Sequence, residues 1–388
     1  MKTNHQIVFG NSREMSLIAS NSAGMVVTSP PYPMIEMWDE IFTRQNPEIG
    51  DALKHGQGSK AYELMHKELD AVWDEVFRIL ASGGIACINI GDATRTVSGD
   101  FALYTNHARI LSYMQNLGFS SLPVILWRKQ TNAPNKFMGS GMLPPGAYVT
   151  LEHEYILIFR KGPKREFNHS EEKSLRRESA FFREERNLWF SDIWFDLKGT
   201  SQSLNHEKMR SRSAAFPFEL PYRLINMFSV KGDLVVDPFL GMGTTMFAAM
   251  AAGRNFIGYE MDANFKEGIL SKAQTSLAVS NQRIRERLSE HLEFVRERTE
   301  TKGPLKHMNR HYRFPVMTGQ ETDLILNQLK TVKKLEDNSF EATYSDTPQS
   351  GFYDQGVDLL YSATDKQGTK GPGKTKPASK ESQLSLLR

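Results

Sequence analysis

Two short segments of the chain combine residue types that could perform chemistry. The first is Ser29-Pro30-Pro31-Tyr32, which follows the apolar run 25–27. Its two prolines fix the backbone and lack N–H groups, so carbonyl oxygens in the turn can point outward without internal partners. The Ser29 hydroxyl and the Pro30 carbonyl could accept the two hydrogens of an amine on a flat ring, and Tyr32 could stack on a base flipped out of a helix. The segment predicts a pocket for a base amine, and the alternative is a turn that only ends a strand.

The second segment, Asp237-Pro238-Phe239-Leu240-Gly241-Met242-Gly243-Thr244, predicts a turn that binds a nucleoside. It follows the apolar run 234–236 and leads into a helical pattern, and its glycines let a ligand approach the backbone. The next apolar run ends at Glu260. An acidic residue about 20 residues after such a turn can accept hydrogen bonds from ribose hydroxyls. The alternative is a tight strand-to-helix turn without a ligand.

The residues of this turn also discriminate between nucleoside cofactors. The third glycine of the dinucleotide fingerprint is absent, and no lysine follows the glycines to form a phosphate-binding loop. Asp237 would repel a pyrophosphate, whereas its charge suits the cationic amino acid end of S-adenosylmethionine. We therefore expect S-adenosylmethionine as the cofactor. A nicotinamide-dependent oxidoreductase is the alternative from another enzyme class.

The single cysteine, Cys87, lies in the middle of the apolar run 84–90. Carbon methylation of cytosine needs a cysteine nucleophile, and a residue in mid-strand is more typical of a buried core thiol. We therefore expect direct transfer to nitrogen, which relies on positioning rather than on a covalent intermediate. A single cysteine forms no internal disulfide, and we expect no metal site.

Alternating strands and helices must position these turns. The apolar runs predict strands at 7–9, 24–27, 85–90, 121–127, 154–159, 234–237 and 255–260, and helical spacing predicts helices at 60–80, 104–116, 244–252 and beyond 276. This alternation predicts an α/β fold, with a doubly wound, mostly parallel sheet covered by helices on both faces. The segment 33–59 has no clear period, and we expect a mobile loop beside the Pro-Pro turn.

Composition limits the class of protein but not its substrate. The chain has 388 residues, of which 39% are hydrophobic and 24% charged, and its net charge is +3. That balance neither requires nor excludes nucleic acid as a partner. We expect no secretory signal, and no apolar run of the sequence approaches the roughly 18 residues that span a bilayer. We expect a soluble cytoplasmic protein without a membrane partner.

The two turns, in this order, resemble those of the β-group, circularly permuted DNA amino-methyltransferases. Thr28-Ser29-Pro30-Pro31-Tyr32 matches the catalytic motif of that family, and the glycine turn matches its donor-binding motif. Phe216-Pro217-Phe218-Glu219-Leu220 with Arg223, Gly258-Tyr259-Glu260, Gly10-Asn11 and Asn89-Ile90-Gly91-Asp92 also fit. The resemblance covers roughly residues 5–162 and 205–275, and it implies a Rossmann-like fold. The donor-binding residues that it implies are Asn11, Asp237, Pro238, Phe239, Gly241, Gly243, Thr244 and Glu260.

The resemblance also implies a reaction. A serine before Pro-Pro-Tyr is similar to the members that methylate N4 of cytosine, whereas members that methylate N6 of adenine more often carry Asp or Asn. We expect methylation of cytosine N4 at a specific sequence of duplex DNA, in a restriction-modification system with a restriction endonuclease as partner. The catalytic residues are then Ser29, Pro30, Pro31 and Tyr32. The alternatives are adenine N6 methylation and a DNA-binding module without turnover.

The motifs and the charge pattern together divide the chain into five parts. We expect the catalytic half at 1–163, a target-recognition insertion at 164–204, the cofactor half at 205–275, an accessory extension at 276–364 and a disordered basic tail at 365–388. The insertion is rich in charge of both signs. Its candidates for DNA contacts are Lys164, Arg165, Arg176, Arg177, Arg183 and Arg186. The alternative is a solvated segment with no role in DNA binding.

Overall fold

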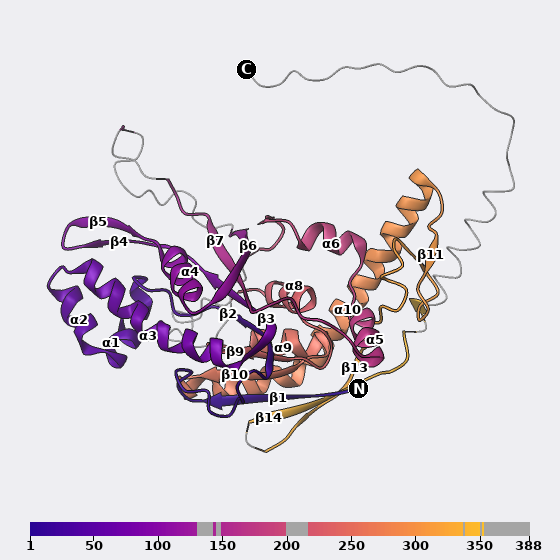
Figure 1. The fold of residues 1–388 in the computed structure, drawn as a ribbon, viewed down its shortest axis with the longest axis horizontal. Coiled ribbons are helices and arrows are strands. Elements are labelled where there is room, and N and C mark those ends of the chain that lie inside the picture. Colours follow the sequence, from indigo (N-terminus) through magenta and orange to yellow (C-terminus); the bar gives the residue numbers. More distant parts are fainter. Residues whose placement is uncertain (130–142, 145–148, 199–215, 337, 350, 353–388) are drawn as a thin grey trace, which may run out of the picture.

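The computed structural model describes residues 1–129, 143–144, 149–198, 216–336, 338–349 and 351–352. Within them, the main sheet contains ten strands (Figure 1). In spatial order they are β13 (Leu329–Lys334), β14 (Ser339–Tyr344), β1 (Lys2–Phe9), β10 (Asn255–Glu260), β9 (Leu234–Asp237), β2 (Ala23–Thr28), β3 (Leu80–Ile90), β7 (His153–Lys161), β6 (Phe119–Arg128) and β8 (Ile193–Trp194). All strands expected from the apolar runs are present, and the predicted α/β fold is confirmed.

The centre of the sheet is parallel, and its edges are not. Strands β1, β10, β9, β2 and β3 run in one direction, as the sequence predicted. Strand β7 is antiparallel to both β3 and β6, and β14 is antiparallel to β1 and β13. An apolar run carries no information on direction, so the alternation of elements could not predict these reversed strands.

Helices cover both faces of the sheet. Helices α8 (Glu219–Phe228) and α9 (Thr244–Ala252) pack on one face, and α3 (Gly58–Ile79) and α4 (Asn106–Asn116) pack on the other. In β2, the side chains of Met25 and Val27 belong to the first core and that of Val26 to the second. This alternation follows from the two-residue period of a strand.

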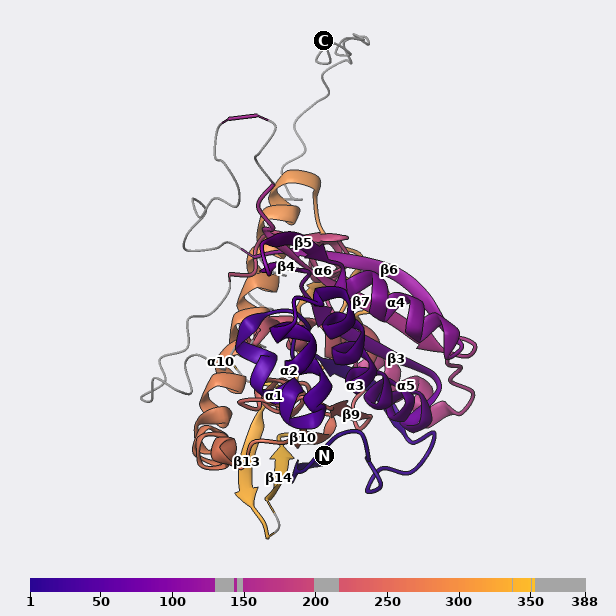
Figure 2. The same ribbon diagram turned by 90° about the vertical axis from the view of Figure 1, so that its left-hand side faces the viewer.

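The expectation of a mobile loop at 33–59 is wrong. The segment forms η1 (Glu36–Trp38), α1 (Asp39–Gln45) and α2 (Pro47–Lys54), with Phe42 and Ile49 buried. The Asn46 side chain accepts a hydrogen bond from the backbone of Glu48 at 3.1 Å, which caps α2 ahead of its first-turn proline. The Asn-Pro pair was therefore a signal for a helix start. Figure 2 shows α1 and α2 on the side of the molecule that faces the viewer.

Beyond β10, the chain forms η2 (Ala263–Phe265) and the long helix α10 (Lys266–Lys302). The expected boundary between residues 275 and 276 falls inside α10, so the chain has no structural break there. Two later strands, β13 and β14, extend the main sheet beside β1. The C-terminal extension is thus built into the catalytic fold. Smaller elements are β4 (Ala93–Val97), β5 (Asp100–Tyr104), β11 (His307–Met308) and β12 (Pro315–Val316).

The segment expected to be an insertion packs on this extension. It contains α5 (Ser170–Glu178) and α6 (Arg183–Trp189) before β8. Glu185 of α6 accepts a hydrogen bond from Arg287 of α10 at 2.7 Å, and both side chains are buried. Residues 199–204 of this segment, residues 205–215 of the expected cofactor half and the tail 365–388 lie outside the described residues.

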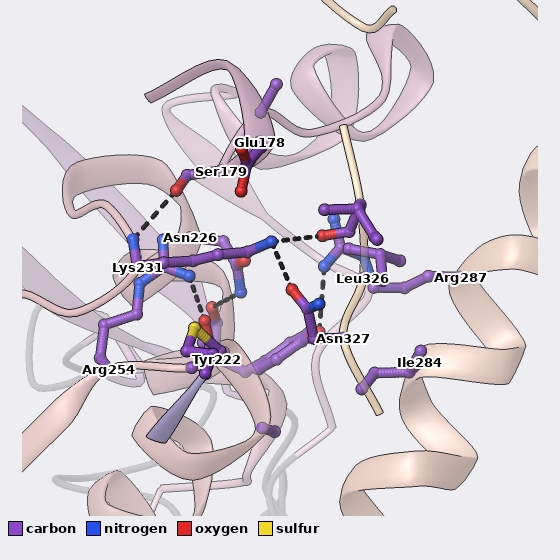
Figure 3. Close-up of a pocket in the computed structure, with 16 residues that line it drawn as sticks. Glu178, Ser179, Tyr222, Asn226, Lys231, Arg254, Ile284, Arg287, Leu326 and Asn327 are labelled. Atoms are coloured by element: carbon purple, nitrogen blue, oxygen red, sulfur yellow. Dashed lines mark hydrogen bonds between the residues drawn. The ribbon is translucent and has the colours of Figure 1, made fainter. Parts of the chain in front are cut away.

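A small polar cavity of about 10 Å³ marks the junction of these parts (Figure 3). Lys231 reaches across it and donates hydrogen bonds from Nζ to the Ile325 carbonyl at 2.7 Å and to Asn327 at 2.6 Å. Its backbone N–H donates to Ser179 Oγ at 2.9 Å. Burial lowers the pKa of Lys231 to about 7. This lysine, which lies between α8 and β9, therefore joins the end of α5 and the segment 325–327 to the main sheet.

Among the described residues, no helix is long and apolar enough to cross a membrane.

Candidate active site

The two predicted turns meet in one cavity of about 310 Å³, although they are far apart in the sequence. They lie at the carboxyl ends of the neighbouring parallel strands β2 and β9, where ligands of open α/β sheets bind. The cavity is lined by Ser29, Pro30, Pro31 and Tyr32 from the first turn and by Asp237, Pro238, Phe239, Gly241 and Thr244 from the second. Glu260, at the end of β10, completes this group.

The glycine turn has the conformation that its sequence predicted. Gly241 and Gly243 have φ values of +54° and +82°, a region in which only glycine is free of steric cost. A Cβ atom added to Gly241 would meet nothing within 4 Å, so a ligand can approach this part of the backbone. Helix α9 starts directly after Gly243. The turn therefore suits close contact with a cofactor.

Two of the expected donor-binding residues do not line the cavity. Gly243 is absent from the lining and packs toward Ile269, whose Cγ2 would lie 3.1 Å from an added Cβ. Asn11 accepts a hydrogen bond from the backbone of Arg13 at 3.1 Å, and its neighbour Ser12 lines the cavity instead.

Glu260 presents its carboxylate at the end of β10. One oxygen accepts from the backbone N–H of Gly241 and the other from that of Asp262, both at 2.8 Å. Burial, with smaller contributions from the nearby Asp262 and Asp237 charges, raises the pKa of Glu260 to about 7. The free lone pairs of this carboxylate could accept ribose hydroxyls, and its charge changes near neutral pH.

Asp237 is almost fully buried and ties the two turns together. Its carboxylate accepts hydrogen bonds from Thr28 Oγ1 and Thr245 Oγ1, both at 2.6 Å, and from the Phe239 backbone at 3.0 Å. Burial raises its pKa to about 6. Because Thr28 directly precedes Ser29, these bonds hold the catalytic turn against the cofactor turn.

The catalytic turn is held by a hydrogen-bond network. Ser29 Oγ lies 3.1 Å from the Tyr32 hydroxyl, which donates to Glu154 Oε2 at 2.9 Å. Asn89 Nδ2 donates to the Tyr32 oxygen at 2.9 Å and to Glu154 Oε2 at 2.7 Å, and Lys129 Nζ lies 2.8 Å from Glu154 Oε1. Burial and the Glu154 charge raise the pKa of Tyr32 well above its usual range, so its phenol is neutral.

The Asn-Ile-Gly-Asp run at the end of β3 supports the Tyr32 ring. A Cβ atom added to Gly91 would lie 3.0 Å from Tyr32 Cε2, so the ring sits against bare backbone. Asn106 donates to the carbonyls of Gly91 at 3.0 Å and Pro33 at 3.1 Å. This buried amide therefore fixes the end of β3 to the residue that follows Tyr32.

Sequence reasoning missed several lining residues. Helix α1 and the preceding η1 contribute Trp38, Ile41, Arg44 and Gln45, and the chain after Glu260 contributes Met261, Asp262, Asn264 and Phe265. The first group lies in the segment that was expected to be a loop. Glu260-x-Asp262, with a second carboxylate two residues after the strand end, was a usable signal for the other group.

Cys87 is fully buried within the core on the α8 and α9 side of the sheet. Burial raises the pKa of its thiol, so a thiolate nucleophile is disfavoured. The prediction of a core thiol is confirmed. Within the described ranges, no cluster of three or more His, Cys, Asp or Glu side chains could hold a metal ion.

Four of the basic residues predicted to contact DNA lie away from the catalytic turn. Arg165 pairs with Asp233 at 2.8 Å, just before the start of β9, and its backbone would lie 2.6 Å from a Cβ added to Gly83 at the start of β3. These are the opposite ends of the strands from Ser29. Lys164 adjoins Arg165, and Arg176 stacks on the same Phe167 ring as Arg165, 4.8 Å from its centroid, with Arg177 beside it in α5. Contacts of these four residues with the bases around the target are therefore not supported.

Arg183 and Arg186 lie in a different place. They are exposed residues of α6, which leads to β8. Strand β8 pairs with Leu126 and Trp127 at the carboxyl end of β6, on the catalytic edge of the sheet. The structure thus separates these two residues from the other four.

A doubly wound sheet with a glycine turn, an acidic strand end and a polar aromatic turn at one edge defines a Rossmann-like enzyme with a nucleoside cofactor. The family model of N6 and N4 methyltransferases, described as DNA methylase, matches residues 23–272. The chain belongs to this DNA methylase family.

Related proteins agree with this assignment. The chain is 54% identical over 347 residues to the Type II methyltransferase M.MthZI of Methanothermobacter thermautotrophicus. The match covers 89% of this chain and 96% of that protein. It is 52% identical over 281 residues to the Type II methyltransferase M.MjaI of Methanocaldococcus jannaschii, with 70% and 91% covered. A solved structure of a putative DNA modification methylase from Thermus thermophilus, complexed with S-adenosyl-L-methionine, is 32% identical with a TM-score of 0.54, and 70% and 95% of the two chains are covered.

The predictions of a DNA methyltransferase and of S-adenosylmethionine as its cofactor are therefore confirmed, and duplex DNA is the substrate of this class of enzyme. The nicotinamide-dependent alternative is excluded by the same findings.

Proposed function

We propose that this enzyme transfers the methyl group to N4 of cytosine in a specific sequence of duplex DNA. The observation that carries this proposal is Ser29 at the head of the catalytic turn, in the cavity shared with the cofactor turn. A serine hydroxyl is neutral, whereas members that act on adenine N6 more often carry Asp or Asn there. Methylation of adenine N6 in the same pocket is the alternative.

The cavity residues have distinct roles in this proposal. Glu260 and the Gly241 backbone would hold the nucleoside part of the cofactor, which supplies an electrophilic methyl group when bound. Ser29 Oγ and the Pro30 carbonyl would accept the two hydrogens of the base amine, which localises the nitrogen lone pair for in-line attack. Tyr32, whose ring is fixed by Gly91 and by its hydroxyl bonds, would stack on the flipped base.

The order of the two turns and the biological setting are also part of the proposal. The catalytic turn precedes the cofactor turn in the chain, as in the circularly permuted β-group. Two relatives bear the name Type II methyltransferase, which supports pairing with a restriction endonuclease. Methylated DNA should then resist one endonuclease in a panel with different recognition sequences, and uniform cleavage by the panel would argue against such a site.

Nucleoside analysis tests the central proposal. The protein is incubated with labelled S-adenosylmethionine and mixed genomic DNA, the DNA is digested, and the labelled nucleoside is identified by mass. We expect N4-methylcytosine, and N6-methyladenine would overturn the assignment to cytosine. Ser29→Ala should lower the single-turnover rate about 100-fold while the cofactor affinity stays within about twofold, because in this scheme Ser29 contacts the base and not the cofactor. Equal losses of the single-turnover rate and of the cofactor affinity would contradict the role of Ser29.

A further inference from the structure

Beyond fixing the Tyr32 hydroxyl, Glu154 has no role in the reaction proposed above, yet it lies two hydrogen bonds from Ser29. It is at the start of β7, paired in register with Trp127 of β6, and its side chain is only 12% exposed. Its two oxygens receive hydrogen bonds from three neighbours, Tyr32, Asn89 and Lys129. This buried carboxylate therefore collects three hydrogen bonds directly beside the catalytic turn.

The direction of each hydrogen bond follows from the chemistry of the groups. An ionised carboxylate only accepts, so the single hydrogen of the Tyr32 hydroxyl points to Glu154. The Tyr32 oxygen then acts as an acceptor, and it receives Asn89 Nδ2–H at 2.9 Å. Asn89 cannot present its oxygen here, because the same Nδ2 also donates to Glu154 at 2.7 Å.

The same reasoning fixes the hydroxyl of Ser29. It lies 3.1 Å from the Tyr32 oxygen, which has no hydrogen left to give, so Ser29 must donate. With its one hydrogen directed inward, Ser29 Oγ offers only lone pairs to the cavity. A serine would otherwise be free to donate or accept, and the base amine needs an acceptor.

We propose that Glu154 is a positioning residue that, through Tyr32, makes Ser29 an obligate hydrogen-bond acceptor for the base amine. The inference rests on the proposed role of Ser29 as the amine acceptor. It explains how a neutral serine meets the same demand as an acidic side chain, which accepts without any help. Glu154 itself does not contact the base in this arrangement.

The test is a set of double-variant cycles built on Glu154→Gln, measured as single-turnover methyl transfer. The Gln amide can donate to Tyr32, which lets the Tyr32 and Ser29 hydrogens reverse and point a donor at the amine. We expect Glu154→Gln to lower the rate about 10- to 100-fold in the natural background, the effect of losing one strong hydrogen bond. Cofactor affinity should change less than about threefold.

Two further backgrounds separate this role from a merely structural one. In Ser29→Asp, the side chain accepts whatever the network does, so Glu154→Gln should change the rate less than about threefold. In Tyr32→Phe, the link between Glu154 and Ser29 is already cut, and Glu154→Gln should again add little. Equal losses from Glu154→Gln in all three backgrounds, or no loss in the natural one, would overturn the proposal.

Glu152→Gln is the matched control. Glu152 lies two residues before Glu154, is partly exposed and pairs with Arg128 at 3.0 Å outside the network, so this variant should keep the natural rate. Nucleoside identity is read from the same reactions. N6-methyladenine with the coupling intact would overturn the cytosine assignment but not the role of Glu154. N4-methylcytosine with additive losses would overturn only the role of Glu154.

Discussion

The carboxylate of Glu260 should make cofactor binding depend on pH near neutrality. Its pKa is raised from 4.5 to about 7 by burial, and the ribose and the cationic sulfonium both favour its ionised form. About a tenth of the protein is ionised at Glu260 near pH 6 and about three quarters near pH 7.5. If only the ionised form binds, the affinity for S-adenosylmethionine should rise about eightfold over this interval.

Titration calorimetry at several pH values measures this effect, and Glu260→Gln is the control. Asp237 and the amino group of the cofactor also titrate nearby, but they do so in both proteins. The quantity to compare is therefore the slope of the logarithm of the cofactor affinity against pH, taken as the difference between the natural protein and the variant. The variant should bind more weakly and lack the Glu260 part of the slope. Equal slopes in both proteins would refute the assignment of this proton to Glu260.

The raised pKa of Glu260 should also make the stability of the protein without cofactor depend on pH. A carboxyl group whose pKa is raised by folding stabilises the fold below its unfolded value of 4.5, and this contribution is lost as the pH rises through about 7. The loss is at most about 3–4 kcal/mol for a shift of this size. Thermal unfolding without cofactor should thus show a decline across this window that is smaller in Glu260→Gln.

Three other predictions concern catalysis, stability and DNA binding. Gly91→Ala should lower methyl transfer about tenfold at unchanged cofactor affinity, because the new Cβ would lie 3.0 Å from the Tyr32 ring; single-turnover rates and calorimetry check this. Arg287→Met should lower the free energy of unfolding in urea by about 3–5 kcal/mol, because it leaves the buried Glu185 carboxylate without its partner. The double variant Arg183→Ala with Arg186→Ala should weaken DNA binding and reduce its salt dependence, measured by fluorescence anisotropy.

Each of these has a control with the same chemical change elsewhere. Gly351→Ala adds a Cβ where nothing lies within 4 Å and should leave transfer unchanged. Arg128→Met removes an exposed ion pair and should cost no more than about 1 kcal/mol. Arg176→Ala, at the other edge of the sheet, should leave DNA affinity as it is. A loss of DNA affinity from this control equal to that of the double variant would reverse our assignment of the two basic groups.

The local features of the active site were readable in the sequence. Pro30 and Pro31 restrict the catalytic turn, and Gly241 and Gly243 permit the left-handed conformations of the cofactor turn. These effects depend on a residue and its immediate neighbours, so the residue types are sufficient evidence for them. The strands before both turns followed from their apolar runs in the same way, and the α/β class followed from their alternation with helices.

Only the tertiary structure decided the contacts between residues far apart in the chain. Glu154 reaches Tyr32 because β7 runs antiparallel beside β3, with Ile90 opposite Tyr155, and an apolar run encodes neither direction nor register. Arg165 looked like a DNA ligand because charge alone does not say at which end of the sheet a side chain lies. The sequence by itself therefore determined the two turns and their chemistry, while the packing of the sheet determined which distant side chains complete the site.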